Sequence, residues 1–486
     1  MTVERIVEQL VAEAVWDDDR AVWLGDEVEP DARGGRAVVY HAVGGDLYGG
    51  TAGIGLFLAR AAADERTARA AAGATRHALA WVERTRPDGA LLSGAGGVAL
   101  AALEVADRLD DPELRARAVR VARVAVARPP VAADLVSGLA GHLLALLRLE
   151  QLGLDLPAEA AADVAAERLM ATAGPGPVVG VAWSSDIGGE APLCGLAHGA
   201  SGPALALAEW GARRRRAEPL AVAREAVAYE RAWFSAREGS WADLRGLDER
   251  AVRDGSTPGY PHLWCHGSLG IGVARLRLYE VTGDEVYAAE AGVAVDAAVG
   301  VLESMGSGPA DDLSTCHGVA GAVELLLDAS RTFGQPVLAE MAREGAAAAV
   351  ELVGDDPWPC GVPDGGENPS LFVGLAGIGT MLLRLDHPEV PSTVRAYAGR
   401  TMSDRVIVKL AGPLDAAEVS QRVASVTAAV PGARVDRVSP SGRVLLRLPV
   451  DADPAAAVAT LGALAGVEYA EQDVVDSHQG TDSPAV

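Results

Sequence analysis

The sequence predicts a mainly α-helical protein, a seven-repeat α/α barrel (toroid), followed by a small α+β domain. Three observations support this prediction. A Gly-x-x-Gly element recurs seven times along the chain. Each element is followed by an apolar segment and then by an amphipathic one. Beyond the last repeat, the pattern changes to short strand-like runs that alternate with helical ones.

The glycine pairs define the repeat. Counted from the first glycine of each pair, successive spacings run from 44 to 68 residues, which is enough for two helices and their connections. The Ala- and Leu-rich segments that follow the pairs, such as GIGLFLARAAA, favour helix. The pairs are Gly50/Gly53, Gly94/Gly97, Gly138/Gly141, Gly199/Gly202, Gly267/Gly270, Gly318/Gly321 and Gly374/Gly377.

Apolar inner helices and amphipathic outer helices can close into a barrel, with each glycine pair permitting a tight turn before an inner helix. Seven loops would then meet at one end. An open solenoid is the alternative, since repetition alone does not establish closure, although no repeat has the distinct character of a cap. The Gly/Pro-rich stretches 174–195 and 234–264 are predicted loops that could build a substrate mouth.

The domain limits follow from the pattern. The barrel is expected over 1–390, and its first segment, MTVERIVEQLVAEAVW, predicts an amphipathic helix, not a signal peptide. Residues 404–476 predict the order β-α-β-β-α-β of a ferredoxin-like domain. The tail 477–486 lacks a core-forming pattern and is expected to be disordered.

Composition excludes several classes of function. The formal net charge of −25 argues against nucleic acid as a partner. No apolar run approaches the roughly 18 residues of a membrane span. Four cysteines are too few for a disulfide framework in a chain of 486 residues. We therefore expect a cytoplasmic protein whose reduced thiols are available as metal ligands.

Two Cys-His-Gly turns carry the chemistry. Cys265-His266-Gly267 and Cys316-His317-Gly318 occupy equivalent positions in two repeats, which composition alone does not explain. Equivalent positions would bring both cysteines to one rim, where thiolate and imidazole groups favour zinc (Zn2+). His198, directly before the fourth glycine pair, points to the same rim. The alternative is that the small cysteine side chains merely pack against the glycine turns.

The motifs LCGLAHGASG, WCHGSLGIG and TCHGVAGA resemble those of the lanthionine synthetase C-like (LanC-like) family, and the likeness spans about residues 40 to 385. With GSWADLR upstream of the second motif, the chain is most similar to the cyclase half of bifunctional lanthipeptide synthetases. The resemblance implies a zinc-dependent cyclase on an α/α barrel. No dehydratase half is expected, so a separate dehydratase would supply the substrate.

The resemblance also implies residue roles. Cys265, Cys316 and His317 would be the zinc ligands, and the family pattern alone selects His317 over His266 as the third ligand. His198 and Asp134 correspond to active-site positions. His266 stands where the stand-alone bacterial cyclases have Tyr.

The reaction that the resemblance implies joins a zinc-held thiol to the β-carbon of dehydroalanine or dehydrobutyrine, which leaves an enolate that needs a proton at its α-carbon. We expect His198 to deliver this proton, with His266 as the second choice and Asp134 as the group that orients the ring. Asp134 could equally cap the helix that begins near Gly138. Pro261 occupies a position that is basic in some cyclases.

We predict that the substrate is a dehydrated precursor peptide. The alternatives are addition of glutathione or another small thiol to dehydroamino acids, and a non-catalytic zinc-containing scaffold that binds a peptide or protease. A glycoside hydrolase would need two carboxylates at the rim, and Asp134 alone is evident. The C-terminal domain resembles a subtilisin propeptide or inhibitor domain in two segments, VIVKL and LGALAGVEYAEQDV. This resemblance implies a subtilisin-like protease as a partner.

Overall fold

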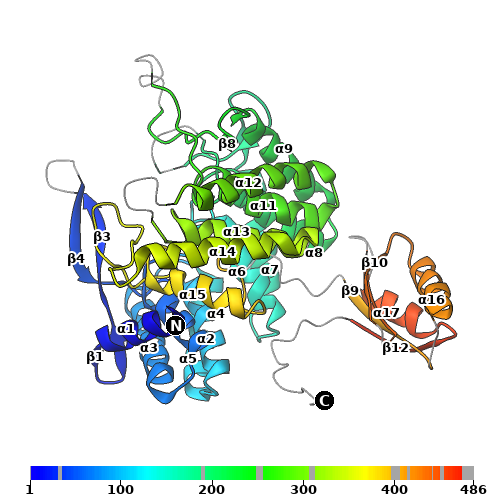
Figure 1. Cartoon of the computed structure of the whole chain (residues 1–486), viewed down its shortest axis with the longest axis horizontal. Helices are drawn as coiled ribbons and strands as arrows, with labels where there is room; N and C mark the ends of the chain where they lie inside the picture. Colours follow the sequence, from blue (N-terminus) through cyan, green and yellow to red (C-terminus); the bar gives the residue numbers. More distant parts are fainter. Residues whose placement is uncertain are drawn as a thin grey trace. The chain divides into compact units, whose positions relative to one another are not determined.

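The computed structural model describes residues 2–30, 36–185, 187, 192–247, 256–305, 312–395, 405–412, 416–439, 442–448 and 454–472. The chain divides into two compact units (Figure 1). The helical unit comprises Met1–Gly211 and Ala217–Ala398, and the C-terminal unit comprises Ala212–Arg216 and Gly399–Val486. No helix among the described residues is long and apolar enough to cross a membrane.

A helix begins just after the first glycine of each predicted pair. Six of these glycines are the N-cap residues themselves, and the helices are almost entirely buried. The glycine-led helices are α2 (Thr51–Ala61), α4 (Ala95–Arg108), α6 (Leu139–Gln151), α8 (Ser201–Arg214), α11 (Ser268–Thr282), α13 (Val319–Phe333) and α15 (Leu375–Asp386).

The turn before α11 illustrates why glycine is needed. Gly267 has φ +89°, in the left-handed region, and a Cβ there would lie 1.8 Å from the carbonyl oxygen of Pro261. A Cβ on Gly270 would lie 1.9 Å from the carbonyl oxygen of Trp264. Any side chain at these positions would therefore force apart the turn that presents Cys265.

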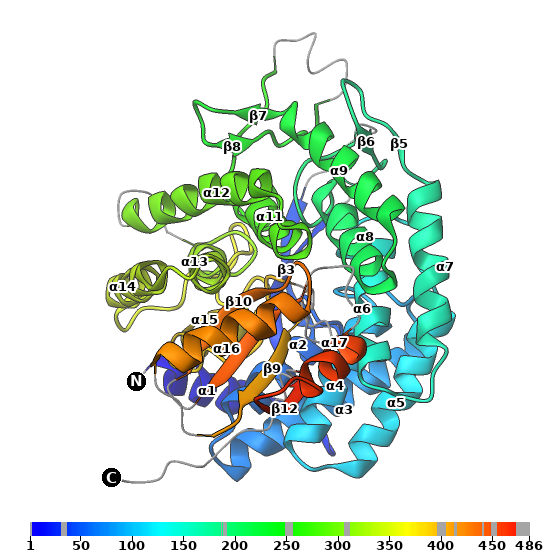
Figure 2. The same cartoon turned by 90° about the vertical axis from the view of Figure 1, so that its right-hand side faces the viewer.

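Amphipathic helices cover the glycine-led ones. In Figure 2, α12 and α14 lie on the outer side of α11 and α13, and α7 lies outside α6. Asp64 and Asp111 cap α3 and α5 by accepting hydrogen bonds from the backbone N–H of Thr67 and Leu114. The covering helices are α1 (Thr2–Glu13), α3 (Glu65–Thr85), α5 (Pro112–Ala127), α7 (Ala158–Ala171), α9 (Ala217–Arg231), α12 (Glu285–Glu303) and α14 (Pro336–Val353).

Backbone hydrogen bonds of 2.8–3.2 Å connect the loops that precede the glycine-led helices, and we call this series the loop ring. It returns to its start, because the seventh loop donates to the first. In order, the bonds run from Tyr48 N to Leu92 O, Leu92 N to Val136 O, Leu135 N to Ala197 O, Ala197 N to Cys265 O, Trp264 N to Cys316 O, Cys316 N to Phe372 O, and Phe372 N to Tyr48 O.

Four short hairpins in the helical unit were not predicted. Two of them, β5–β6 and β7–β8, lie in the stretches 174–195 and 234–264 that were expected to be loops. The antiparallel pairs are β1 (Val15–Asp17) with β2 (Arg20–Val22), β3 (Leu24–Pro30) with β4 (Arg36–Ala42), β5 (Gly174–Pro175) with β6 (Val181–Ala182), and β7 (Phe234–Ser235) with β8 (Ser240–Trp241).

The C-terminal unit has the predicted element order: β9 (Arg405–Leu410), α16 (Ala416–Ala429), β10 (Arg434–Val438), β11 (Arg443–Arg447), α17 (Pro454–Gly462) and β12 (Val467–Gln472). Its antiparallel sheet has the strand order β10-β11-β9-β12. One face of the sheet buries Val406, Val408, Val444 and Leu446 against the two helices. The tail 477–486 lies outside the described residues.

Candidate metal centre and active site

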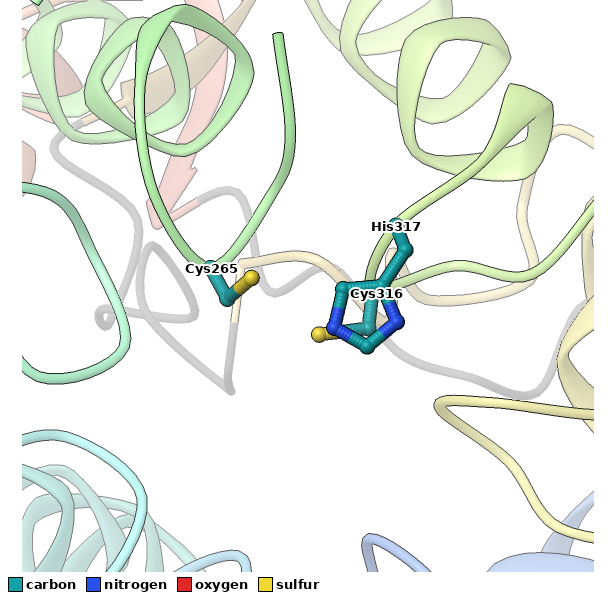
Figure 3. Close-up of side chains that lie close together, drawn as sticks. All are labelled: Cys265, Cys316 and His317. Atoms are coloured by element: carbon teal, nitrogen blue, oxygen red, sulfur yellow. The ribbon is translucent and has the colours of Figure 1, made fainter. Parts of the chain in front are cut away.

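Three of the predicted site residues converge at the loop ring. Cys265 ends the turn before α11, and Cys316 and His317 lie in the turn before α13. One ligand atom from each of the three lies within 4.8 Å of the others, and Figure 3 shows the two sulfur atoms pointing toward one another. In the part of the chain that the structure describes, this is the one such group of His, Cys, Asp or Glu side chains found.

The hydrogen bonds of His317 fix which nitrogen is available to a metal. Its Nδ1 lies 3.1 Å from the carbonyl oxygen of Gly361, and its backbone N–H donates to Ser314 Oγ at 3.2 Å. Because a carbonyl oxygen only accepts, the neutral ring carries its proton on Nδ1. The lone pair is then on Nε2, which is the usual arrangement of a metal-binding histidine.

The two cysteines shift each other's pKa in opposite directions. The thiol of Cys316 donates a hydrogen bond that holds the pKa of Cys265 well below its usual range, against the opposing effect of burial. Burial and the same hydrogen bond raise the pKa of Cys316. The Tyr48 hydroxyl also donates to Cys316, and it partly offsets that rise. A cation between the two sulfur atoms would favour both as thiolates.

His198 and Asp134 meet beside the cysteines. His198 Nδ1 lies 3.6 Å from Asp134 Oδ1, which is longer than a hydrogen bond but close enough for a strong attraction if the ring is protonated. Although burial disfavours its ionisation, the His198 ring and Ser137 hold the pKa of Asp134 below its usual range.

Asp134 also caps its own loop. It accepts hydrogen bonds from the backbone N–H of Ser137 at 2.7 Å and from the Ser137 hydroxyl at 3.0 Å. These bonds close the loop before α6 and are not the helix cap that the sequence suggested, because Gly138 is the N-cap residue of α6 and no side chain caps that helix.

His266 lies on the other side of His198, with the ring centroids 6.1 Å apart. It does not belong to the converging group of Cys265, Cys316 and His317. Burial lowers the pKa of His266, so the ring is neutral at pH 7, and its buried Nδ1 has no hydrogen-bond partner among the residues that the structure describes. A neutral ring with one unpaired nitrogen is suited to accept or relay a proton, and less suited to be the first donor.

Four residues at the site were not identified as functional from the sequence: Tyr48, Asp243, Arg245 and Gly361. Tyr48 stacks on Phe372 at 4.8 Å and comes from the first repeat, which carries no Cys-His signature. Asp243 and Arg245 lie within GSWADLR, which was recognised as a motif without roles for its members. Tyr48 reaches the cysteines through the bond between the seventh loop and the first, and Gly361 meets His317 from the loop before α15. No local signal marks these positions.

The remaining candidate thiols and histidines have ordinary partners. His142 Nδ1 bonds to the carbonyl oxygen of Gly89 at 2.8 Å, and His262 Nδ1 bonds to Ser268 Oγ at 2.8 Å. The thiol of Cys360 lies 3.8 Å from the carbonyl oxygen of Asn368, and Cys194 is buried. None of these belongs to the converging group.

Comparisons with known proteins agree with the sequence motifs. The family model described as lanthionine synthetase C-like protein matches residues 41–396, and the model of the fervidolysin N-terminal prodomain matches residues 390–473. No curated protein matches the sequence.

Among solved structures, a nisin cyclase has a similar fold, with a TM-score of 0.55 at 15% identity over 82% of this chain and 96% of its own. An α-1,6-mannanase from Salegentibacter sp. HEL1_6 gives a TM-score of 0.43 at 13% identity over 80% of this chain and 98% of its own. This TM-score is too low to support any inference. The lanthionine synthetase C-like family model, in contrast, covers well over half of the sequence. The chain therefore belongs to the lanthionine synthetase C-like family.

Proposed function

We propose that this chain is a zinc-dependent lanthipeptide cyclase, which adds cysteine thiols of a peptide to dehydroalanine or dehydrobutyrine and so forms thioether (lanthionine) rings. The observation that carries the proposal is the convergence of Cys265, Cys316 and His317 beside the His198–Asp134 pair. The family match supports it, because the matched residues include all five of these side chains.

The donor set fits zinc. Two thiolates and one imidazole are soft and borderline ligands, and three protein ligands are typical of catalytic zinc sites. The hydrogen bond that orients His317 supports its selection over His266 as the third ligand. When bound, zinc would hold a substrate thiol as thiolate at the coordination position that these residues leave open.

The chain's own side chains would handle the proton. Attack of the thiolate on the β-carbon moves the double-bond electrons onto the neighbouring carbonyl oxygen. His198, held by the charge of Asp134, would then donate a proton to the α-carbon, and the electrons of the enolate form the new C–H bond. His266, neutral at pH 7, would take up a proton from solvent on one ring nitrogen and pass the proton of the other nitrogen to His198.

We further propose that residues 1–390 form a closed seven-repeat α/α barrel with the site at one end. The loop ring supports closure over an open solenoid, because its last bond joins Phe372 of the seventh loop to Tyr48 of the first. Helix α15 also packs against both α1 and α2, at the start of the chain.

The proposed partners follow from the reaction. The substrate is a precursor peptide that a separate dehydratase has dehydrated, and we expect the reaction to take place in the cytoplasm. The match of residues 390–473 to a protease prodomain supports a subtilisin-like protease as partner of the C-terminal unit.

One experiment separates the cyclase from a zinc-containing scaffold. The full chain, with zinc content measured, is incubated with a dehydrated peptide that contains one cysteine and one dehydroalanine. A cyclase consumes the thiol faster than the uncatalysed rate and leaves the peptide mass unchanged. Thiol loss at the uncatalysed rate with zinc fully bound would contradict the proposal.

The same experiment distinguishes the small-thiol alternative. With glutathione added, an enzyme that prefers external thiols gives a product heavier by one glutathione. A cyclase gives the ring even in excess glutathione, because the two reacting groups belong to one bound peptide.

A further inference from the structure

Arg245 is held in a fixed orientation close to the site. It follows β8, where Asp243 is anchored by a hydrogen bond from its backbone N–H to the carbonyl oxygen of Gly259 at 2.8 Å. Arg245 Nη2 and Nε donate to the Asp243 carboxylate at 2.7 and 3.0 Å, which makes a bidentate ion pair. Its Nη1 has no acceptor among the described residues.

The guanidinium lies within electrostatic range of the cysteines. The strand before it is tied to the turn of Cys265, since Ser240 Oγ of β8 donates to the carbonyl oxygen of Pro261 at 2.6 Å. The charges of Asp243, Cys265 and Cys316 raise the pKa of Arg245, and the charge of Arg245 helps to lower the pKa of His266. The side chain is 39% exposed, so a peptide in the site could reach it. In contrast, Arg275 and Arg384 of the helical unit are fully buried in ion pairs with glutamates and are out of reach of a substrate.

The proposed reaction creates a negative charge that needs such a donor. As the sulfur–carbon bond forms, the carbonyl oxygen of the dehydroamino acid gains the electron pair of the broken double bond. A guanidinium N–H pair suits this oxygen, because its hydrogen bond strengthens as charge develops. The charge disappears again when the α-carbon is protonated.

We propose that Arg245 is a catalytic residue that binds the carbonyl oxygen of the dehydroamino acid through Nη1 and stabilises the charge that develops on it, and that Asp243 is its positioning residue. This inference rests on the proposed cyclase function. The bidentate pair holds the guanidinium before substrate binds, so little reorganisation is needed during the reaction.

The test compares variants of the full chain with the same dehydrated peptide. Arg245→Met should lower kcat by about 10²–10³-fold, the usual cost of losing one donor to a developing oxyanion. KM should stay within about threefold, because the bond strengthens mainly in the transition state. Arg245→Lys should recover part of the lost rate, and Asp243→Asn should lower kcat by less than Arg245→Met does.

A second readout does not depend on activity. An unreactive peptide, with serine in place of its cysteine, is titrated into the zinc-free protein. We expect its Kd, the melting temperature and the zinc stoichiometry after reloading to be the same in Arg245→Met as in the unsubstituted chain. Arg237→Met is the matched control, since this arginine lies in the same hairpin, is 92% exposed and pairs with Glu238.

The outcomes are distinct. If Arg245→Met retains the kcat of the unsubstituted chain, the catalytic role is wrong. If it loses zinc or folding stability, the ion pair with Asp243 is structural and the inference is also wrong. If the unsubstituted chain itself gives no thioether with zinc bound, the proposed function has failed, whatever the Arg245 variants do.

Discussion

His317 and Gly361 are in contact, with Nδ1 of the histidine 3.1 Å from the carbonyl oxygen of the glycine. A Cβ on Gly361 would lie 3.0 Å from that same nitrogen and 2.5 Å from Ser314 Oγ. The loop around Gly361 therefore approaches the ring as closely as a backbone can. Two separate loops thus determine where the third proposed ligand points.

Gly361→Ala should weaken zinc binding, because the added methyl group pushes against His317 and Ser314. We expect zinc affinity to fall about 10–100-fold, the usual effect of disturbing a group that orients a metal ligand. The measurement is competition for zinc with a chromophoric chelator. Gly292→Ala is the control, since a Cβ there meets nothing within 4 Å and should leave zinc affinity unchanged.

Cys316→Ala should remove zinc and activity together. The alanine deletes one of the two sulfur ligands, and Cys265 and His317 alone cannot hold the ion against dilution. Metal analysis after gel filtration gives the stoichiometry. Cys360→Ala should keep one zinc per chain, since Cys360 does not belong to the converging group and its thiol lies 3.8 Å from the carbonyl oxygen of Asn368. Stoichiometric zinc in Cys316→Ala would mean that the ligand set is wrong.

His198→Ala should keep its zinc and lose most of its turnover. General acid catalysis is typically worth about 10²–10⁴-fold, and His198 is the ring that the Asp134 carboxylate approaches. Mass spectrometry in heavy water would follow both ring closure and deuterium incorporation at the α-carbon. The exposed His387 serves as the control, and His387→Ala should react as the unsubstituted chain does. Equal turnover in the two variants would exclude His198 from the mechanism.

The stability of the helical unit should fall in mild acid, in part because of His142. Burial lowers the pKa of this ring in the folded chain, whereas the unfolded value is about 6.5. Below pH 6.5 the unfolded state therefore binds more protons than the folded one. The stability that neutral His142 contributes is present above that pH and decreases by at most about 1.4 kcal/mol per unit as the pH falls.

Urea unfolding of the zinc-free protein between pH 7 and 5 measures this dependence. We expect His142→Gln to lose less stability over that range than the unsubstituted chain, even if it is less stable at pH 7. His387→Gln should keep the original dependence, because this histidine is exposed. If the free energy of unfolding of His142→Gln falls with pH as steeply as that of the unsubstituted chain, other groups cause the acid sensitivity.

The sequence predicted the parts of the fold that depend on local chemistry. A glycine pair followed by Ala- and Leu-rich residues defined where each inner helix begins, as the N-cap residues Gly94 and Gly138 illustrate. Alternating apolar residues likewise predicted the strands of the C-terminal unit. The hairpins β5–β6 and β7–β8 could not be predicted, because their two-residue strands have no periodicity to detect.

The site was predictable only where the signature is contiguous. Cys265 and Cys316 were identified from their repeated tripeptides and His198 from its place before a glycine pair. The family resemblance selected His317 as the third ligand and supplied the roles of His198 and Asp134. Tyr48, Gly361 and Arg245 were missed, because they come from three different loops and gain meaning only from their neighbours in space. Their residue types are common in loops and carry no chemical signature on their own.

The loop ring has a consequence for how the protein is made. Its last bond joins Phe372 to Tyr48, and these residues are 324 positions apart in the sequence. Such a distant pairing comes late in folding, because the loop that it closes is long. The backbone of Cys316 donates to Phe372 and the ring of His317 is held by Gly361, so the three proposed ligands are held in place together only when synthesis has passed the seventh loop. We therefore expect nascent chains to remain without metal until almost the whole helical unit has left the ribosome.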